Sequence, residues 1–179
     1  STNEAIMTNS SFLISSIQNQ EQLKLAEKIL ENKELCSNIQ EEDIISLGMM
    51  IQSLTSTGQR RLAEKIIDNE NLYKNEDVMC FAEGIIKSAN TPMKTKIAEK
   101  ILDDKELYNN AMVIQNADGF IDEVTTEEQR NVVLKVLDSK ELRNNEIAIG
   151  VLKRLTAASK TPKQAGIALK ILDSAKIQT

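Results

Sequence analysis

The 179-residue sequence contains no histidine and no tryptophan, and aromatic residues make up only 3% of it. Without histidine, the chain lacks the commonest general base, the commonest metal ligand and the usual pH-sensitive side chain of proteins. The two cysteines, Cys36 and Cys80, have no further thiol at metal-ligand spacing, so we expect reduced thiols and neither a disulfide nor a zinc site. These absences predict a protein that is not an enzyme, with no catalytic residues, no cofactor and no metal.

Long hydrophobic runs and an excess of basic residues are also missing. No apolar run approaches the ~20 residues of a transmembrane helix, and no signal peptide is visible, so membrane insertion is not expected. The net charge of −5 and the pI near 5.0 argue against a nucleic-acid binder, because such binding depends on clustered Lys and Arg. The first residue is Ser1 rather than Met, so we expect that an upstream segment has been removed.

What the sequence does contain is one stretch that recurs along the chain. It reads AEKILDDKEL from Ala98 onward, and related copies begin at Ala26, Ala63, Val133 and Ala168. Successive copies are 37, 35, 35 and 35 residues apart. A fixed period of this size is typical of stacked repeat proteins.

Each repeat reads as two helices joined with almost no loop. Good N-cap residues recur where a helix that we call helix A begins: Asn19, Ser56, Thr91, Thr126 and Thr161. Three residues after four of these caps stands a glutamine, as in a capping box: Gln22, Gln59, Gln129 and Gln164. Pro92 and Pro162 follow two of the caps at the first helical position, where a missing N–H has no cost. The helix before each cap is called helix B, and residues 3–19 read as the first one.

Two further columns define the turn between helix A and the next helix B. An apolar column is expected to fill the gap between the helices: Leu35, Leu72, Leu107, Leu142 and Ile177. An asparagine column is expected to cap each following helix B: Asn3, Asn38, Asn75, Asn110 and Asn145. The two extra residues of the longest interval are assigned to a loop within 39–42.

The predicted fold is therefore all-α: an α-solenoid, or α-α superhelix, of five two-helix repeats with about ten helices. One repeat buries too few aliphatic side chains to offset the entropy of ordering about 35 residues, so neighbouring repeats must stack. We expect a single repeat domain over residues 1–179 that is part of a longer array. The predicted repeats span approximately 3–37, 38–74, 75–109, 110–144 and 145–179.

The pattern resembles the α-solenoid class of tandem helical repeats, which includes HEAT, armadillo, tetratricopeptide and pentatricopeptide arrays. The resemblance covers essentially the whole chain and rests on the period and the helix pairing. The Trp, Gly, Tyr and Pro signature of tetratricopeptide repeats is missing, as are the paired base-reading positions of pentatricopeptide repeats, so no family's functional residues carry over. The resemblance implies an extended curved surface that holds a protein or peptide.

Helix A carries the most regular charges of the chain. Its lysines are Lys28, Lys65, Lys100, Lys135 and Lys170, and an acid follows each three residues later: Glu31, Asp68, Asp103, Asp138 and Asp173. Lysine and acid at this spacing attract each other on a helix, and they could also form a ladder across repeats. We expect a solvated, self-neutralised outer face rather than a grip for a polyanion.

Helix B differs most between the repeats, as a binding surface requires. We predict that residues outside its apolar stripe line the concave side and bind the partner: Glu76, Glu83, Lys87, Gln115, Asp118, Asp122 and Lys153. Glu83, Asp118 and Asp122 would form an acidic central patch for a basic or polar partner, and the alternative is that they merely face solvent. Asp118 and Asp122 are also a carboxylate pair, but a helix surface in water offers no dry pocket for acid–base catalysis.

The sequence favours a non-enzymatic interaction module or scaffold for a protein or peptide partner. The alternative is a spacer or stalk of a longer repeat protein, because distinctive end caps are missing. The same absence allows end-to-end self-association. Nucleic-acid binding is a distant third interpretation, and the richness in Asn, Lys and Ile suggests an AT-rich bacterial coding sequence.

Overall fold

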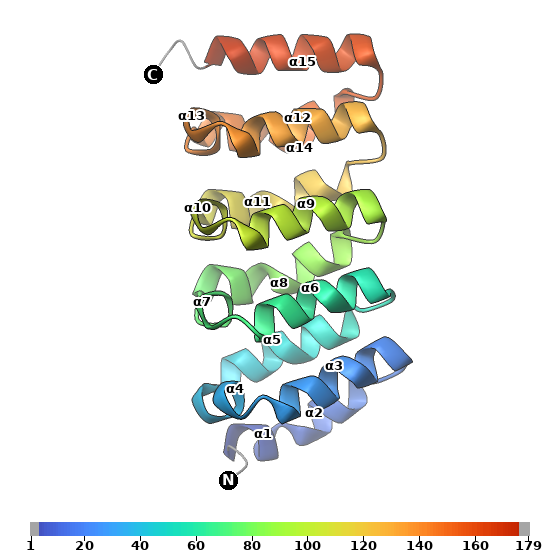
Figure 1. Ribbon diagram of the computed structural model, residues 1–179, viewed down its shortest axis with the longest axis vertical. Helices are drawn as coiled ribbons and strands as arrows, with labels where there is room; N and C mark the ends of the chain where they lie inside the picture. The colour runs from blue at the N-terminus through green and yellow to red at the C-terminus, as the bar shows by residue number, and fades with distance from the viewer. Residues whose placement is uncertain (1–3, 176–179) are drawn as a thin grey trace. The chain divides into compact units, whose positions relative to one another are not determined.

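The computed structural model describes residues 4–175 of the chain, which form fifteen α-helices and no β-strand (Figure 1). The prediction of an all-α protein is therefore confirmed. Two predicted positions, the Asn3 cap and the Ile177 member of the apolar column, lie outside the described residues. Within the described range, no helix combines the length and the hydrophobicity that a membrane crossing needs.

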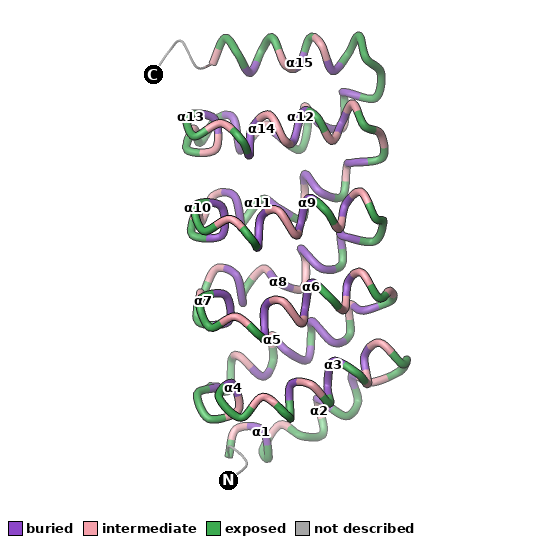
Figure 2. The backbone as a smooth tube through the Cα atoms, in the orientation of Figure 1, coloured by how far each residue is buried: buried purple, intermediate pink, exposed green. Residues whose placement is uncertain are grey.

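The long helices are amphipathic, and their buried positions recur at helical spacing (Figure 2). In α12 (Glu127–Asp138), for example, Val132, Val133, Val136 and Leu137 are buried. Residues at this spacing share one face of a helix, so α12 turns one apolar stripe inward and its charged residues outward.

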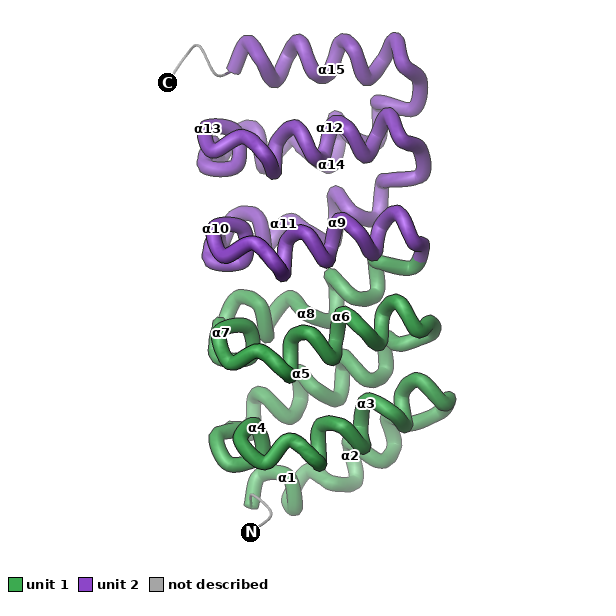
Figure 3. Tube along the Cα trace, viewed as in Figure 1, with its two compact units in different colours: residues 1–90 green, residues 91–179 purple. Residues whose placement is uncertain are grey.

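The chain divides into two compact units, residues 1–90 and residues 91–179 (Figure 3). The division lies between α8 (Glu76–Ser88) and α9 (Pro92–Asp103), inside the predicted repeat 75–109. The single domain expected over residues 1–179 stays a prediction.

Unit 1 holds the helices of the first half of the described chain. They are α1 (Glu4–Thr8), α2 (Ser10–Ser15), α3 (Gln20–Glu31), α4 (Lys33–Asn38), α5 (Glu41–Gln52), α6 (Thr57–Ile67), α7 (Glu70–Tyr73) and α8. The two A helices of this unit, α3 and α6, pack against each other, and the B helix α5 packs against both α2 and α8. The short α7 contacts both α6 and α8.

Unit 2 has the same kinds of helix contact. Its helices are α9, α10 (Lys105–Tyr108), α11 (Ala111–Asp122), α12, α13 (Lys140–Arg143), α14 (Glu146–Ala158) and α15 (Pro162–Ala175). The A helix α12 packs against α9 and α15, and the B helix α11 packs against α14. Within each unit, helices of the same predicted type therefore lie against each other.

The prediction of about ten helices is wrong, chiefly because the four turns that follow α3, α6, α9 and α12 are themselves helical. These turns form α4, α7, α10 and α13. Each holds one member of the apolar column, and all four members are buried: Leu35, Leu72, Leu107 and Leu142. The apolar side chain therefore anchors a helical turn rather than an irregular one.

The first B helix is also shorter than predicted, because it breaks at Asn9 into α1 and α2. The side chains of Thr8, Asn9 and Ser10 donate hydrogen bonds to nearby backbone carbonyl groups. Such bonds compete with the helical backbone pattern, which explains a break in a run of small polar residues.

The two extra residues of the 37-residue interval lengthen α4 and do not form the loop that we predicted within 39–42. Helix α4 has six residues, whereas α7, α10 and α13 have four each. As a result, Asn38 ends α4, and Gln40 takes the N-cap position of α5 that we predicted for Asn38. The predicted caps Asn75, Asn110 and Asn145 are confirmed, since each side chain accepts a backbone N–H three residues later.

The capping column at the start of the A helices is confirmed, and its glutamines also bridge helices. Gln59 and Gln129 are each 1% exposed. Their Nε2 groups donate at 3.0 Å to the backbone carbonyls of Ile86 and Thr156, near the ends of α8 and α14. Each glutamine therefore satisfies polar groups at the start of its own helix and at the end of the next B helix.

Candidate functional site

Three of the predicted partner-binding residues lie on α8 in unit 1. Glu76 is the first residue of the helix and is exposed, Lys87 is exposed near its end, and Glu83 between them is half-buried. Of the three, Glu76 lines the groove that is described below, and Glu83 and Lys87 do not.

The other four predicted residues lie in unit 2, with Gln115, Asp118 and Asp122 on α11 and Lys153 on α14. All four are exposed, and the two helices pack against each other. A Cβ atom added at Gly119 would lie 3.3 Å from Lys153 Cδ. The lysine stem therefore covers this glycine, beside Asp118 in the chain.

Asp122 has a buried counter-ion. Its Oδ1 lies 3.4 Å from Nζ of Lys94 on α9, and that lysine side chain is only 7% exposed. Lys94 stands in the column that holds glutamine in other repeats, so it reaches the end of α11 with a charge instead of an amide. The predicted acidic patch is thus divided between the two units, and one of its acids is partly neutralised.

The lysine and acid columns of helix A pair between neighbouring helices. The Nζ to Oδ distances are 2.6 Å for Lys28–Asp68 in unit 1, and 2.6 and 2.7 Å for Lys100–Asp138 and Lys135–Asp173 in unit 2. All of these side chains are at least 30% exposed, and such pairs contribute only ~0.2–1 kcal/mol. These pairs form the ladder that the sequence left as one alternative, and they occupy three of the five column lysines that a polyanion would need.

A groove of about 720 Å³ lies in unit 1 where α4 and α5 face α7 and α8. We call it the α5–α8 groove. One side is formed by Leu35, Asn38, Ile39, Gln40, Glu42, Asp43 and Ser46, and the other by Tyr73, Lys74, Glu76, Met79 and Cys80. Leu35, Ile39 and Met79 are each at most 5% exposed, so they give the groove an apolar floor. Its volume is in the range of sites that hold a small molecule or a peptide side chain.

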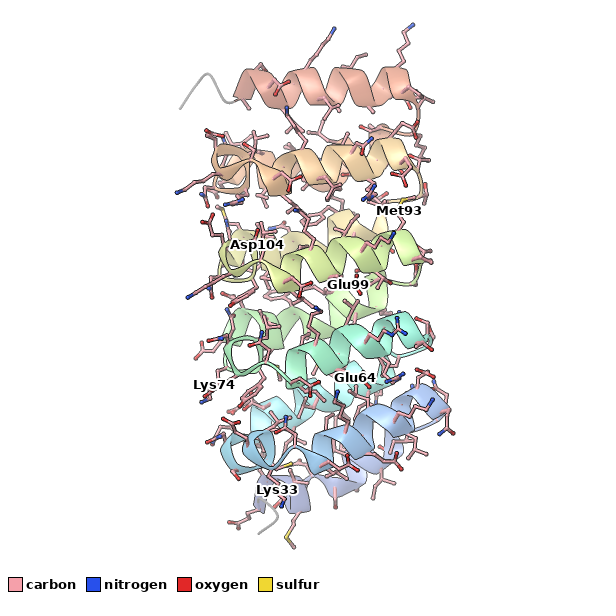
Figure 4. All side chains as sticks on the ribbon, in the orientation of Figure 1. Lys33, Glu64, Lys74, Met93, Glu99 and Asp104 are labelled. Carbon is pink, nitrogen blue, oxygen red and sulfur yellow. The ribbon has the colours of Figure 1, made fainter. Side chains whose placement is uncertain are left out.

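The rim of the α5–α8 groove is acidic. Asp43 accepts the backbone N–H of Gln40 at 3.0 Å as part of the cap of α5. Glu42 and Glu76 have no ion-pair partner among the described residues. The one basic residue of the rim, Lys74 (labelled in Figure 4), pairs with Glu70 of its own turn, and this hydrogen bond raises the pKa of the lysine. The groove therefore has two uncompensated carboxylates above an apolar floor.

Tyr73 adds a buried polar group to the groove lining. The residue is 8% exposed, and its hydroxyl has no hydrogen-bond partner among the described residues. Burial raises the pKa of this phenol, and the nearby carboxylates of Glu34 and Glu70 raise it further. The hydroxyl therefore stays protonated at neutral pH, and an unpaired buried group of this kind costs about 1–3 kcal/mol.

Both cysteines are free thiols, as expected, but their settings differ. Burial raises the pKa of the Cys36 thiol, and its Sγ donates to the carbonyl of Ile29 at 3.2 Å. Cys80 is exposed and lines the α5–α8 groove. Cys80 is therefore the more reactive thiol toward reagents in solution.

Sequence reasoning found Glu76 but missed the rest of the groove. The available signal was the single 37-residue interval, which marks the place where the regular pattern changes. This signal does not show from the sequence alone that a hollow forms.

The described residues contain no group of three or more Cys, Asp or Glu side chains placed to hold a metal ion. In comparisons with known proteins, no family model, no curated protein and no solved structure matches the chain. Any functional argument therefore rests on the geometry of the chain itself.

Proposed function

We propose that this chain is an α-solenoid segment of five two-helix repeats that acts as a non-enzymatic protein-interaction module. The helix contacts within each unit support the solenoid, because helices of the same predicted type pack together and the same lysine–acid pairs recur between them. In this proposal the A helices are structural, and a protein or peptide partner binds on the side of the B helices.

The observation that carries the proposal is the α5–α8 groove. It combines an apolar floor, uncompensated carboxylates and an unpaired buried hydroxyl, whereas Lys28, Lys100 and Lys135 on the A helices already have acidic partners. A few polar groups around an apolar hollow are typical of a recognition site. The exposed residues that the sequence singled out on α8, in the same unit as the groove, would extend the contact surface.

Capture of a partner and reconstitution of the purified pair tests this function. We expect the immobilised chain to retain one protein from a lysate of its source, and that protein to bind the purified chain in isothermal titration calorimetry. The expected Kd is micromolar or tighter, as for specific interfaces. Substituting Glu83, Asp118 and Asp122 with alanine should weaken the complex if the predicted acidic patch takes part.

A spacer or stalk predicts that no protein is retained. Nucleic-acid binding predicts instead an affinity that falls steeply as salt is raised.

End-to-end self-association also stays a proposal. Ile167 and Ile171 of α15 are 56% and 50% exposed, whereas their counterparts Val132 and Val136 in α12 are fully buried. Sedimentation at several concentrations tests it, with reduced association expected for Ile171→Glu.

A further inference from the structure

We propose that the α5–α8 groove binds a lysine or arginine side chain of an extended peptide segment in a partner protein. This inference rests on the proposed function, because it names the chemistry of the partner. It differs from the acidic patch predicted on α8 and α11, since it places recognition between α5 and α8 and adds Glu42 and Tyr73 to the site.

The shape and charge of the groove match a long basic side chain. Lys and Arg carry a flexible aliphatic stem that packs on apolar surface while the charged head stays near water. The stem would lie on Ile39 and Met79, which are 3% and 5% exposed. The head would then reach Glu42 and Glu76 at the rim, and neither carboxylate has an ion-pair partner among residues 4–175.

The hydroxyl of Tyr73 is a second observation that points to a ligand. It is buried, belongs to the lining of the groove and has no hydrogen-bond partner within the described part of the chain. Because the phenol oxygen accepts as well as donates, it can take a hydrogen bond from an ammonium or guanidinium group. The two glutamates would repel an acidic peptide. A purely apolar peptide would offer them neither a counter-charge nor a hydrogen-bond donor.

The experiment is a selection of random nine-residue peptides, displayed on phage, against the full 179-residue chain. We expect enriched peptides to share a Lys or Arg. A fluorescein-labelled copy of the best peptide is then titrated by fluorescence anisotropy. Replacing its basic residue with norleucine should weaken binding about tenfold, and Glu42→Gln combined with Glu76→Gln should have a similar effect.

Matched variants separate the groove from general charge effects. Glu27→Gln on α3 combined with Glu128→Gln on α12 makes the same change in net charge away from the groove. This control variant should bind the peptide with a Kd within about twofold of the original chain. Tyr73→Phe, which removes only the hydroxyl, should weaken binding about three- to tenfold. Circular dichroism confirms that each variant is folded.

The two cysteines locate the bound peptide in the same sample. Saturating peptide should slow alkylation of Cys80 by N-ethylmaleimide several-fold, measured by mass spectrometry, while the rate at Cys36 stays the same. If no peptide is enriched, the inference is overturned, whereas the proposed function is overturned only if the chain also retains no protein in the capture experiment. If a peptide binds but Cys80 is not protected, or the Glu42 and Glu76 variant binds as tightly as the original chain, only the inference is overturned.

Discussion

The junction of α4 with α5 in unit 1 and the junction of α10 with α11 in unit 2 hold the same place in the predicted repeat but differ in structure. In unit 2, Asn110 caps α11, and its amide donates at 2.9 Å to the carbonyl of Arg143, which links two successive turns. In unit 1, Asn38 instead donates at 2.9 Å to the carbonyl of Glu34 within α4. The first junction lacks the bond that ties the second one together.

The difference follows from the two residues that lengthen α4. They move Asn38 out of the cap position and bring Ile39 and Gln40 into the lining of the α5–α8 groove. The acids on α5 also have uncharged counterparts in unit 2, since Glu42 and Asp43 correspond to Met112 and Val113. In this chain, a small change of period therefore turns a structural junction into a candidate site.

The largest expected effect comes from truncating the apolar column at each junction. Leu107 in α10 is fully buried, and Leu35 in α4 lines the groove at 3% exposure. Leu→Ala in a core costs ~2–5 kcal/mol, depending on how well the surroundings relax. We expect Leu107→Ala to lose about 4–5 kcal/mol and Leu35→Ala about 2–3 kcal/mol in urea unfolding, because water and loose side chains can fill the space beside a groove. Equal losses of unfolding free energy would show that the groove beside Leu35 does not reduce the cost of the truncation.

Two glycines should respond to alanine with opposite signs. A Cβ atom at Gly48 in α5 would lie 2.1 Å from Cε1 of Phe12, whereas a Cβ atom at Gly150 in α14 meets nothing within 4 Å. Gly48→Ala should therefore destabilise by about 1–3 kcal/mol, unless the Phe12 ring shifts. Gly150→Ala should stabilise by about 0.5–1 kcal/mol, because alanine favours the helix. Thermal unfolding of both variants tests the pair, and combining Gly48→Ala with Phe12→Leu should recover part of the loss.

The asparagines of the two junctions give a smaller contrast. Asn110→Ala removes the cap of α11 and the bond to Arg143, so we expect a loss of about 1–2 kcal/mol. Asn38→Ala removes one exposed bond inside α4 and should cost less than about 0.5 kcal/mol. Urea unfolding of both variants measures the difference. If Asn38→Ala lowered the free energy of unfolding as much as Asn110→Ala, Asn38 would have a structural role at the α4–α5 junction, contrary to this description.

The smallest effect concerns pH in unit 1. The hydrogen bond from Arg60 lowers the pKa of Glu21, at an Nε to Oε2 distance of 2.7 Å, and Arg60 also pairs with Glu64 (Figure 4). A lowered pKa contributes stability above the ordinary glutamate value of about 4.3, and this contribution is lost as the pH falls through the folded-state value. Glu21→Gln should therefore reduce the melting temperature slightly at pH 7 and leave it unchanged at pH 2–3. Glu27→Gln, which removes no ion pair within residues 4–175, should change the melting temperature at neither pH.

Much of the fold could be predicted because it depends on local chemistry. The caps from Asn19 to Thr161 and the buried column around Leu72 follow from side-chain polarity at fixed spacing. The helical nature of the short turns was missed, because four residues carry too little periodicity to reveal a helix. The break at Asn9 was missed because an apolar stripe outweighed three small polar residues in the prediction.

The candidate site was harder to predict because it depends on which charged and polar side chains lack a partner in the folded chain. Sequence spacing placed Asp122 on an exposed face, but it could not show that Lys94 reaches it from another helix. It also gave no means to tell that Tyr73 lacks a partner, or that Lys74 is engaged by Glu70. Charges can be read from a sequence, but their compensation requires the tertiary contacts.

The most direct test of this account is to delete Ser37 and Asn38, which restores a 35-residue interval and a four-residue turn. We expect the shortened chain to stay helical by circular dichroism and to lose binding of the selected basic peptide in fluorescence anisotropy. A folded deletion variant that binds the peptide with unchanged Kd would contradict the claim that the lengthened α4 creates the site.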